Sequence, residues 1–228
     1  MYTYRAYRPL LHMLSLLTIS LIVLGCSSEP NVSPQATARL PAGETATNQD
    51  VQATPDKIKF KQADEAEKYA LKLRDDGAKL VDGTDRELAR LTLDSNKIKI
   101  KDPADQVLGY VVSHDSYWKL ENADQTQELY VLRRQADGDL KLEDGNDAPI
   151  YRIKVRDYGY EIETPAKQSL YKVKVSNGKI SLRDASEETV LSTRSPLLPA
   201  AMTPFGFDVL TPPQQAALAY AVNRTGGF

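Results

Sequence analysis

The fold of this chain is decided by LYKVKVSNGKISLRD, the stretch from Leu170 to Asp184. Apolar and polar residues alternate along both of its arms, and Asn177-Gly178 between the arms is a dipeptide that tight hairpin turns favour. The stretch therefore predicts a β-hairpin. Two earlier stretches, IYRIKVRDYGYEIET and LYVLRRQADGDLKLED, repeat the pattern at a spacing of about 20 residues, which indicates a repeat architecture.

Three further hairpins precede these, namely YALKLRDDGAKLVDG, LARLTLDSNKIKIKD and LGYVVSHDSYWKLEN, and a last strand, TVLSTR, follows them. Acidic, turn-prone joints such as DGTD, DPAD and DGNDAP separate the units. The series predicts a mainly β fold: a meander of six hairpins with about 12 antiparallel strands, plus the closing strand.

The alternation gives each hairpin one apolar face and one polar face. In the first arms the apolar face carries Ala89, Leu91, Leu93, Tyr130, Leu132, Tyr151, Ile153, Val155, Tyr171, Val173 and Val175. The polar face carries Arg90, Arg133, Arg152, Lys154, Lys172 and Lys174. A hairpin cannot bury its apolar face alone. The six units are compatible with a closed barrel, a β-trefoil or a single sheet.

The C-terminal segment favours the barrel. TPPQQAALAYAVNRTGG begins with an N-cap at Thr211, a proline at the first helical position and a capping-box glutamine at Gln214, which predicts a helix over residues 212–224. This helix is apolar all round, and such a helix is buried. A barrel of twelve strands has an interior wide enough to hold it. The apolar, proline-rich stretch before it, residues 195–210, is expected to cover one end of the barrel.

A meander of hairpins followed by an apolar C-terminal helix resembles the tubby C-terminal-like barrel, which the LURP-one-related proteins and the phospholipid scramblases share. The resemblance covers Lys68 to about Gly226 and rests on the repeat and the element order. Tubby domains bind phosphoinositide head groups and scramblases act at membranes, so the resemblance implies a membrane-associated function. No residue of this chain matches the sites of those families.

The N-terminus has the pattern of a secretory signal. Arg5 and Arg8 precede the apolar run MLSLLTISLIVLG, which is too short to span a bilayer. The run ends in VLGC, which resembles the lipobox of bacterial lipoproteins. The resemblance implies cleavage before Cys26, a lipid on the Cys26 sulfur, and a further acyl group such as palmitate on the new N-terminus. Ser27 rather than aspartate at the next position implies an outer-membrane destination facing the periplasm.

These features divide the chain into a signal peptide at residues 1–25, a lipidated cysteine with a disordered linker at 26–57, and one domain at 58–228. The linker is rich in Ser, Thr, Pro and Ala, a composition that cannot bury enough apolar surface to fold. With Arg5 and Arg8 removed from the 29 basic side chains, 27 remain against 31 acidic ones, a formal charge of −4 that argues against nucleic acid as a partner. Cys26 is the only cysteine, so no disulfide is expected.

Catalytic and metal-binding patterns are scarce. His114 is the single histidine after the signal, and its neighbours Ser113 and Asp115 cannot complete a triad because adjacent strand residues point to opposite faces. No Cys/His set predicts zinc, and the acidic turns lack the calcium-loop pattern. We therefore expect no catalytic residues, no metal and no cofactor. Glu161 and Glu163 are expected to pair across the strands with Arg152 and Lys154.

One surface remains as a candidate site. The basic row, defined as Arg133, Arg152, Lys154, Lys172 and Lys174, is the candidate for contact with anionic lipid head groups or an envelope protein. The alternative is a solvated face balanced by acidic residues. The sequence predicts a non-enzymatic binding or structural module anchored in the bacterial envelope by its lipid. Two other hypotheses are a carrier that holds a lipid in the barrel interior and, third, a hydrolase.

Overall fold

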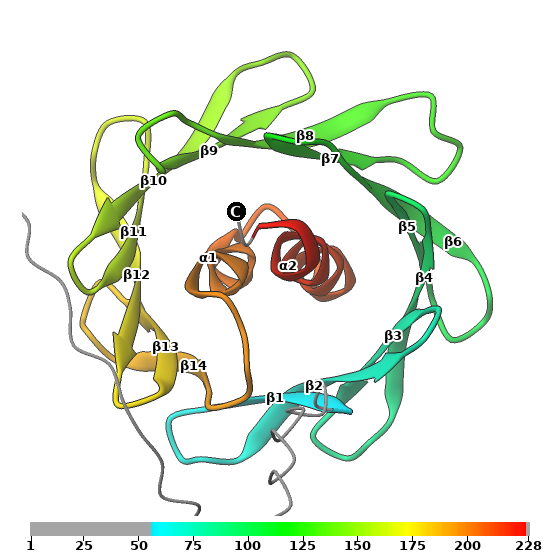
Figure 1. Cartoon of the computed structure of the whole chain (residues 1–228), viewed down its shortest axis with the longest axis horizontal. Coiled ribbons are helices and arrows are strands. Elements are labelled where there is room, and N and C mark those ends of the chain that lie inside the picture. Colours follow the sequence, from blue (N-terminus) through cyan, green and yellow to red (C-terminus); the bar gives the residue numbers. More distant parts are fainter. Residues whose placement is uncertain (1–55, 227–228) are drawn as a thin grey trace, which may run out of the picture. The chain divides into compact units, whose positions relative to one another are not determined.

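The computed structural model describes residues 56–226. The wall of this part is a closed antiparallel barrel in which each strand pairs with its neighbours in the sequence and β1 closes onto β14 (Figure 1). The strands are β1 (Lys57–Lys61), β2 (Glu67–Arg74), β3 (Gly77–Asp82), β4 (Glu87–Asp94), β5 (Lys97–Lys101), β6 (Val107–Ser113), β7 (Tyr117–Glu121), β8 (Glu128–Arg134), β9 (Leu140–Asp144), β10 (Pro149–Arg156), β11 (Gly159–Glu163), β12 (Ser169–Ser176), β13 (Lys179–Asp184) and β14 (Thr189–Thr193).

The predicted mainly β barrel is confirmed, and each of the six predicted hairpins is present, from β2–β3 to β12–β13. The strand number is 14, because KIKFK forms the additional strand β1. The wall therefore begins at Lys57, one residue before the expected domain boundary and eleven before the expected first hairpin at Lys68. The alternation of KIKFK buries Ile58 and Phe60 in the core and leaves the three lysines on the outer face.

The joints between hairpins share a hydrogen-bonded turn. At Asp82, Asp144 and Asp184 the side-chain carboxylate accepts bonds from the backbone amides two and four residues later, at 2.9–3.0 Å. The residue three positions after each of these acids has a positive φ, as at Asp85 and Asp147. Aspartate suits both roles, since its short side chain bonds nearby amides and tolerates the left-handed region. The repeat of acidic joints is thus a repeat of one turn.

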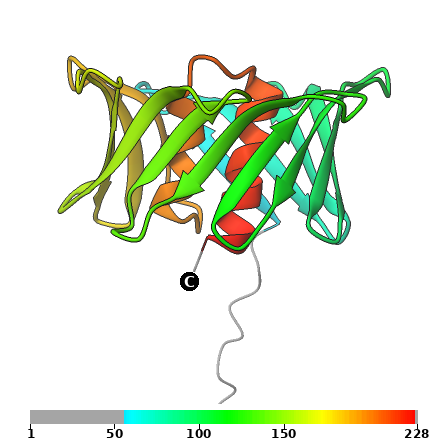
Figure 2. The ribbon, with the colours of Figure 1, turned by 90° about the horizontal axis from the view of Figure 1, so that it is seen from above.

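The barrel has two distinct ends. The hairpin end carries the turns inside the six hairpins, and the joint end carries the turns between them. Lys57 lies at the hairpin end, because β1 runs from it toward the first joint, and α2 (Pro212–Thr225) also finishes there (Figure 2). The predicted alternation holds along most of the wall. Val155 and Val175 are 43 % and 44 % exposed, because the last inward position before each turn lies near this end, and Leu108 on β6 is 37 % exposed.

The C-terminal helix lies buried inside the barrel, as predicted. In α2 every residue from Ala216 to Val222 is buried, and the Thr211 backbone amide donates to the Gln214 side-chain oxygen at 2.9 Å, as a capping box requires. The helix ends at Thr225, one residue beyond the predicted end. No helix within residues 56–226 combines the length and apolar character needed to cross a bilayer.

The segment before α2 was expected to cover one end of the barrel, and this prediction is wrong. The segment lies inside the barrel. Residues 195–210 leave β14 and enter the interior, where α1 (Pro199–Met202) and the 3-10 helix η1 (Thr203–Gly206) lie beside α2, between the walls (Figures 1 and 2). Met202 and Phe207 are fully buried, and the Phe60 and Phe205 rings meet at 4.6 Å. The barrel of 14 strands is wide enough for this second element, which lies between α2 and strands β11–β13, while α2 itself contacts β4–β7.

Polar contacts fix the helices to the wall. The Trp118 indole donates to Thr225 at 2.8 Å, and the Tyr220 hydroxyl donates to the Gly77 carbonyl at 3.2 Å. Tyr171 on β12 donates to the Asp208 carboxylate at 3.1 Å. Burial, together with the Asp208 charge, raises the pKa of Tyr171 to about 12, so this hydroxyl stays a donor at neutral pH. The contacts of Tyr220 and Thr225 hold the C-terminal half of α2 against the wall, and the contact of Asp208 holds the segment that precedes the helix.

Candidate functional site

The predicted basic row lies on the outer face of three strands. Arg133 is on β8, Arg152 and Lys154 are on β10, and Lys172 and Lys174 are on β12. All five are half-buried, and β9 and β11 separate their strands. The structure brings them to one side of the barrel without joining them into one cluster.

Four of the five cations have carboxylate partners. Arg133 donates to Glu143 at 2.8 Å and to Asp147 at 3.1 Å, and Lys154 pairs with Asp139. Lys172 and Lys174 both bind Glu187 at 2.6 Å. These carboxylates come largely from the joints and the neighbouring arms, so the balanced-face alternative describes most of the row.

The two lysines at Glu187 have a clear electrostatic effect. Their hydrogen bonds, first from Lys172 and then from Lys174, lower the pKa of Glu187 to about 2. At Glu143 burial acts to raise the pKa, but bonds from Lys141 and Arg133 outweigh it and hold the pKa below its ordinary value. Both carboxylates are therefore charged at neutral pH and neutralise the cations beside them.

The expected partners of Glu161 and Glu163 were wrong, although the register was right. Arg152 does lie opposite Glu163, and Lys154 opposite Glu161. The ion pairs go instead to Arg156, whose guanidinium binds Glu161 at 2.9 Å and Glu163 at 3.0 Å. The two carboxylates share one face of β11, and the several donors of a guanidinium reach both.

Arg152 is left without an ion-pair partner in the part of the chain that the structure describes. Its neighbour in register on β9 is Lys141, so two cations lie side by side. A cleft of about 450 Å³ opens beside them, bordered by the β8–β9 turn at Gln135–Asp139 and by Lys154. Arg152 is therefore the member of the basic row that makes no ion pair within residues 56–226, and Asp137 and Asp139 line the cleft with it.

The single histidine has a structural environment. His114 lies in the β6–β7 turn and stacks on Tyr117, with ring centroids 4.2 Å apart. Within residues 56–226 no group of three or more His, Cys, Asp or Glu side chains is arranged to hold a metal ion. Cys26, the predicted lipidation site, lies outside the described residues.

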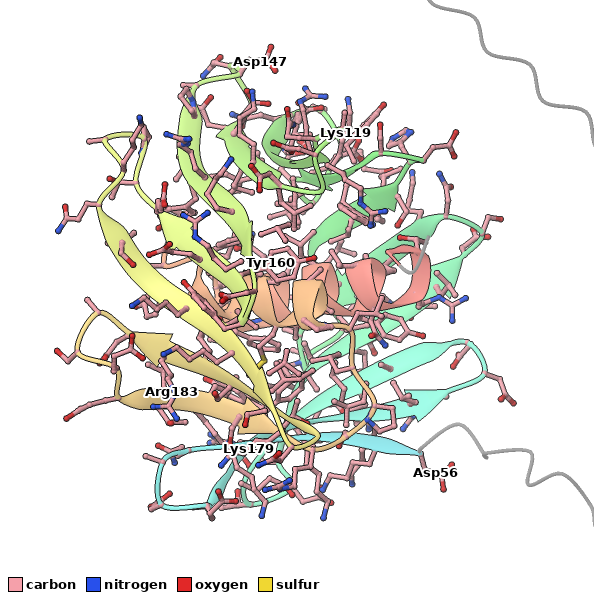
Figure 3. All side chains as sticks on the ribbon, turned by 60° about the vertical axis from the view of Figure 1, so that its left-hand side comes forward. Asp56, Lys119, Asp147, Tyr160, Lys179 and Arg183 are labelled. Atoms are coloured by element: carbon pink, nitrogen blue, oxygen red, sulfur yellow. The ribbon has the colours of Figure 1, made fainter. Side chains whose placement is uncertain are left out.

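A second basic surface was not among the predicted sites. It is the seam cleft, which we define by the cations Lys59, Lys61, Lys179 and Arg194 at the junction of β1 and β14, with a volume of about 300 Å³. Figure 3 shows Lys179 beside the junction where β1 meets the last strands. The alternation of KIKFK places Lys59 and Lys61 on one face. However, Lys179 and Arg194 join them only through barrel closure, which no local pattern reveals.

Comparisons with known proteins leave the function open. No family model matches the chain, and no curated protein matches it. The chain is similar to a crystallised Arabidopsis thaliana protein at 13% identity, over 66% of this chain and 86% of that one, with a TM-score of 0.37. It is also similar to an alternansucrase in complex with isomaltononaose, at 12% identity over 54% of this chain and 13% of that one, with a TM-score of 0.14. Both scores are too low to carry an argument.

Proposed function

We propose that this chain is a lipid-anchored, non-enzymatic binding or structural module of the bacterial envelope. The observation that supports the proposal is the position of Lys57. The first strand starts at the hairpin end, so a lipid on Cys26 would hold a rigid, filled barrel from that end through the intervening residues. The tubby-like resemblance, with its implied membrane association, belongs to the same proposal.

Lipid chains would supply the attachment. Each buried methylene contributes about 0.8 kcal/mol, so two or three acyl chains give durable anchoring where a single chain would exchange. In the proposed setting the anchor is in the outer membrane and the barrel faces the periplasm. The residues between Cys26 and Lys57 set how far the domain stands from the head groups.

The outer surface would supply the binding. The cation that supports this part of the proposal is Arg152, which has no ion-pair partner within the described part of the chain and borders a cleft of about 450 Å³. Its guanidinium suits bidentate contact with a phosphate or carboxylate. We propose anionic lipid head groups or an acidic envelope protein as the partner of the basic row, with Arg152 at its centre.

The anchor is tested at Cys26. We expect Cys26→Ser to abolish lipid attachment and to release the protein from the membrane fraction or leave its signal uncleaved, because only the cysteine sulfur accepts the lipid. Fractionation with metabolic labelling by a fatty acid measures both effects. The matched control is Ser27→Ala, which should remain labelled and membrane-bound. A Cys26→Ser protein that still carries label would contradict the proposal.

The basic row is tested at Arg152. We expect Arg152→Glu to weaken binding of residues 56–228 to vesicles containing an anionic phospholipid by about tenfold at low salt, with added salt producing a similar loss. Vesicle co-sedimentation measures the change. The control, Lys99→Glu, makes the same kind of charge change on the outer face of β5. Equal losses in the two variants would show that net charge, and not the row, governs binding.

A further inference from the structure

The barrel is closed least completely between its first and last strands. β1 makes five register pairs with β2 but a single pair with β14, Lys61 with Ser192. The reason is the path of the chain: β14 ends at Thr193, and the following residues turn inward to form α1. On the β14 side Lys59 consequently has no strand partner, and its backbone amide donates to the Ser195 hydroxyl at 3.1 Å.

Positive charge accumulates at this opening. Glu65 binds Lys179 at 2.7 Å and Lys61 at 3.4 Å, and Glu67 binds Lys57 at 2.7 Å. Lys59 approaches Glu67 only to 3.7 Å, and its side chain is 54 % exposed. Arg194 has no carboxylate partner within residues 56–226, and its guanidinium donates to the Asn177 carbonyl at 3.0 Å.

The local charge is therefore uncompensated. Five cationic side chains, those of the seam cleft together with Lys57, face the two carboxylates of Glu65 and Glu67, which leaves a surplus of three positive charges. The whole chain has a formal net charge of −2, so this surplus opposes the overall balance. Such a site concentrates anions from solution.

The cleft also offers neutral donors. Three hydroxyl side chains line it, and two of them already accept bonds from backbone amides: Thr193 from Ser195 at 3.0 Å, and Ser195 from Lys59 at 3.1 Å. An accepting hydroxyl still has its own O–H to donate. Neither hydroxyl donates to a protein group within the described part of the chain. The cleft thus has more donors than acceptors, which is the complement of an oxyanion.

We propose that the seam cleft binds a phosphate-type oxyanion, either free or carried by a lipid head group. Arg194 contacts two oxygens with its planar guanidinium, Lys59 and Lys179 neutralise the charge, and the Ser195 hydroxyl donates to a remaining oxygen. The volume of about 300 Å³ is at the lower limit of small-ligand sites and holds the anion with a short alcohol attached. This site is separate from the basic row, because its cations lie on β1, on β13 and just after β14.

The proposal is tested by titrating inorganic phosphate into residues 56–228, which form a closed barrel with its own core, while amide chemical shifts are recorded by NMR. Shifts at Lys59 and Arg194 should saturate, and chloride at equal ionic strength should not reproduce them. We expect Lys59→Gln and Arg194→Gln to weaken binding by about 3- to 10-fold, and Lys99→Gln on β5 to leave it unchanged. Glu65→Gln should strengthen binding by about threefold, a gain that misfolding cannot produce.

A vesicle titration identifies the source of the anion. If phosphatidylglycerol vesicles bind and Lys59→Gln weakens this binding while the control Lys99→Gln does not, the ligand is a lipid head group. Saturable binding of phosphate without vesicle binding assigns the site to a free phosphate compound. Linear, non-saturating shifts, or equal effects of Lys59→Gln and Lys99→Gln, would overturn the proposal. These outcomes leave the lipid-anchor proposal untouched, because they do not depend on Cys26.

Discussion

Replacing Ala219 by glutamate is expected to unfold the barrel. Ala219 has no exposed surface and lies in the middle of α2, surrounded by the inward faces of the wall. An unpaired carboxylate buried there costs several kcal/mol, which is comparable to the total stability of about 5–15 kcal/mol that a domain possesses. Removal of residues 211–228 should have the same effect, since burial of Leu218, Tyr220 and Val222 together contributes roughly 5–8 kcal/mol.

Thermal melts of residues 56–228 measure this loss, and the single tryptophan gives a second reading. Trp118 is buried, and its indole donates a hydrogen bond to Thr225. Displacement of α2 should therefore shift the Trp118 fluorescence to longer wavelength. The control is Arg224→Gln, at an exposed position of the same helix, which we expect to change stability by less than about 1 kcal/mol. If the Ala219→Glu protein melted cooperatively at the parent temperature, α2 would not be part of the core.

Replacing Gly77 by alanine is expected to be the most damaging small substitution in the wall. Gly77 has a φ of +146°, and a Cβ atom there would lie 1.9 Å from the Leu91 carbonyl oxygen on β4. Neither the backbone conformation nor the contact tolerates a side chain, so β3 and β4 would have to separate locally. The Gly77 carbonyl also accepts the hydrogen bond of Tyr220, so the disturbance reaches α2. We expect a loss of about 3–5 kcal/mol.

The control for Gly77 is Gly178, a glycine in the β12–β13 turn. Gly178 has a φ of +69°, and a Cβ atom there would meet nothing within 4 Å. Asparagine tolerates this left-handed region, so Gly178→Asn should cost about 1 kcal/mol or less. Urea unfolding of the two variants compares them directly. Similar midpoints for both would mean that β3 and β4 are not as closely apposed as the structure shows.

The elements that the sequence predicted correctly are those determined by nearby residues. Each of the six hairpins has its alternation and its turn within about 15 residues, and α2 has its proline, its capping glutamine and its apolar surface in one stretch. KIKFK was missed as a strand because it is short and lacks a hairpin partner before it. Its second neighbour, β14, lies far away in the sequence.

The interior and the surface sites depend on contacts that local patterns do not encode. Residues 195–210 contain prolines and no helical or strand period, so the sequence indicated burial but not the position of α1 beside α2. Register predicted which residues face Glu161 and Glu163, but the longer reach of Arg156 decided the ion pairs. The seam cleft combines residues of the first strand with residues of the last two strands and of the segment after them. Its charge surplus becomes visible only when the barrel is closed.

Native mass spectrometry of the protein purified from its own cells tests most directly the claim that the chain is a lipid-anchored module with a filled barrel. We predict a mature chain that starts at Cys26 and carries covalent acyl groups, with no lipid retained non-covalently inside the barrel. The two helices already occupy that interior, and their apolar side chains are buried against the wall. An unmodified Cys26, or an apolar ligand retained at one copy per chain, would contradict the account, and the ligand would favour the carrier hypothesis.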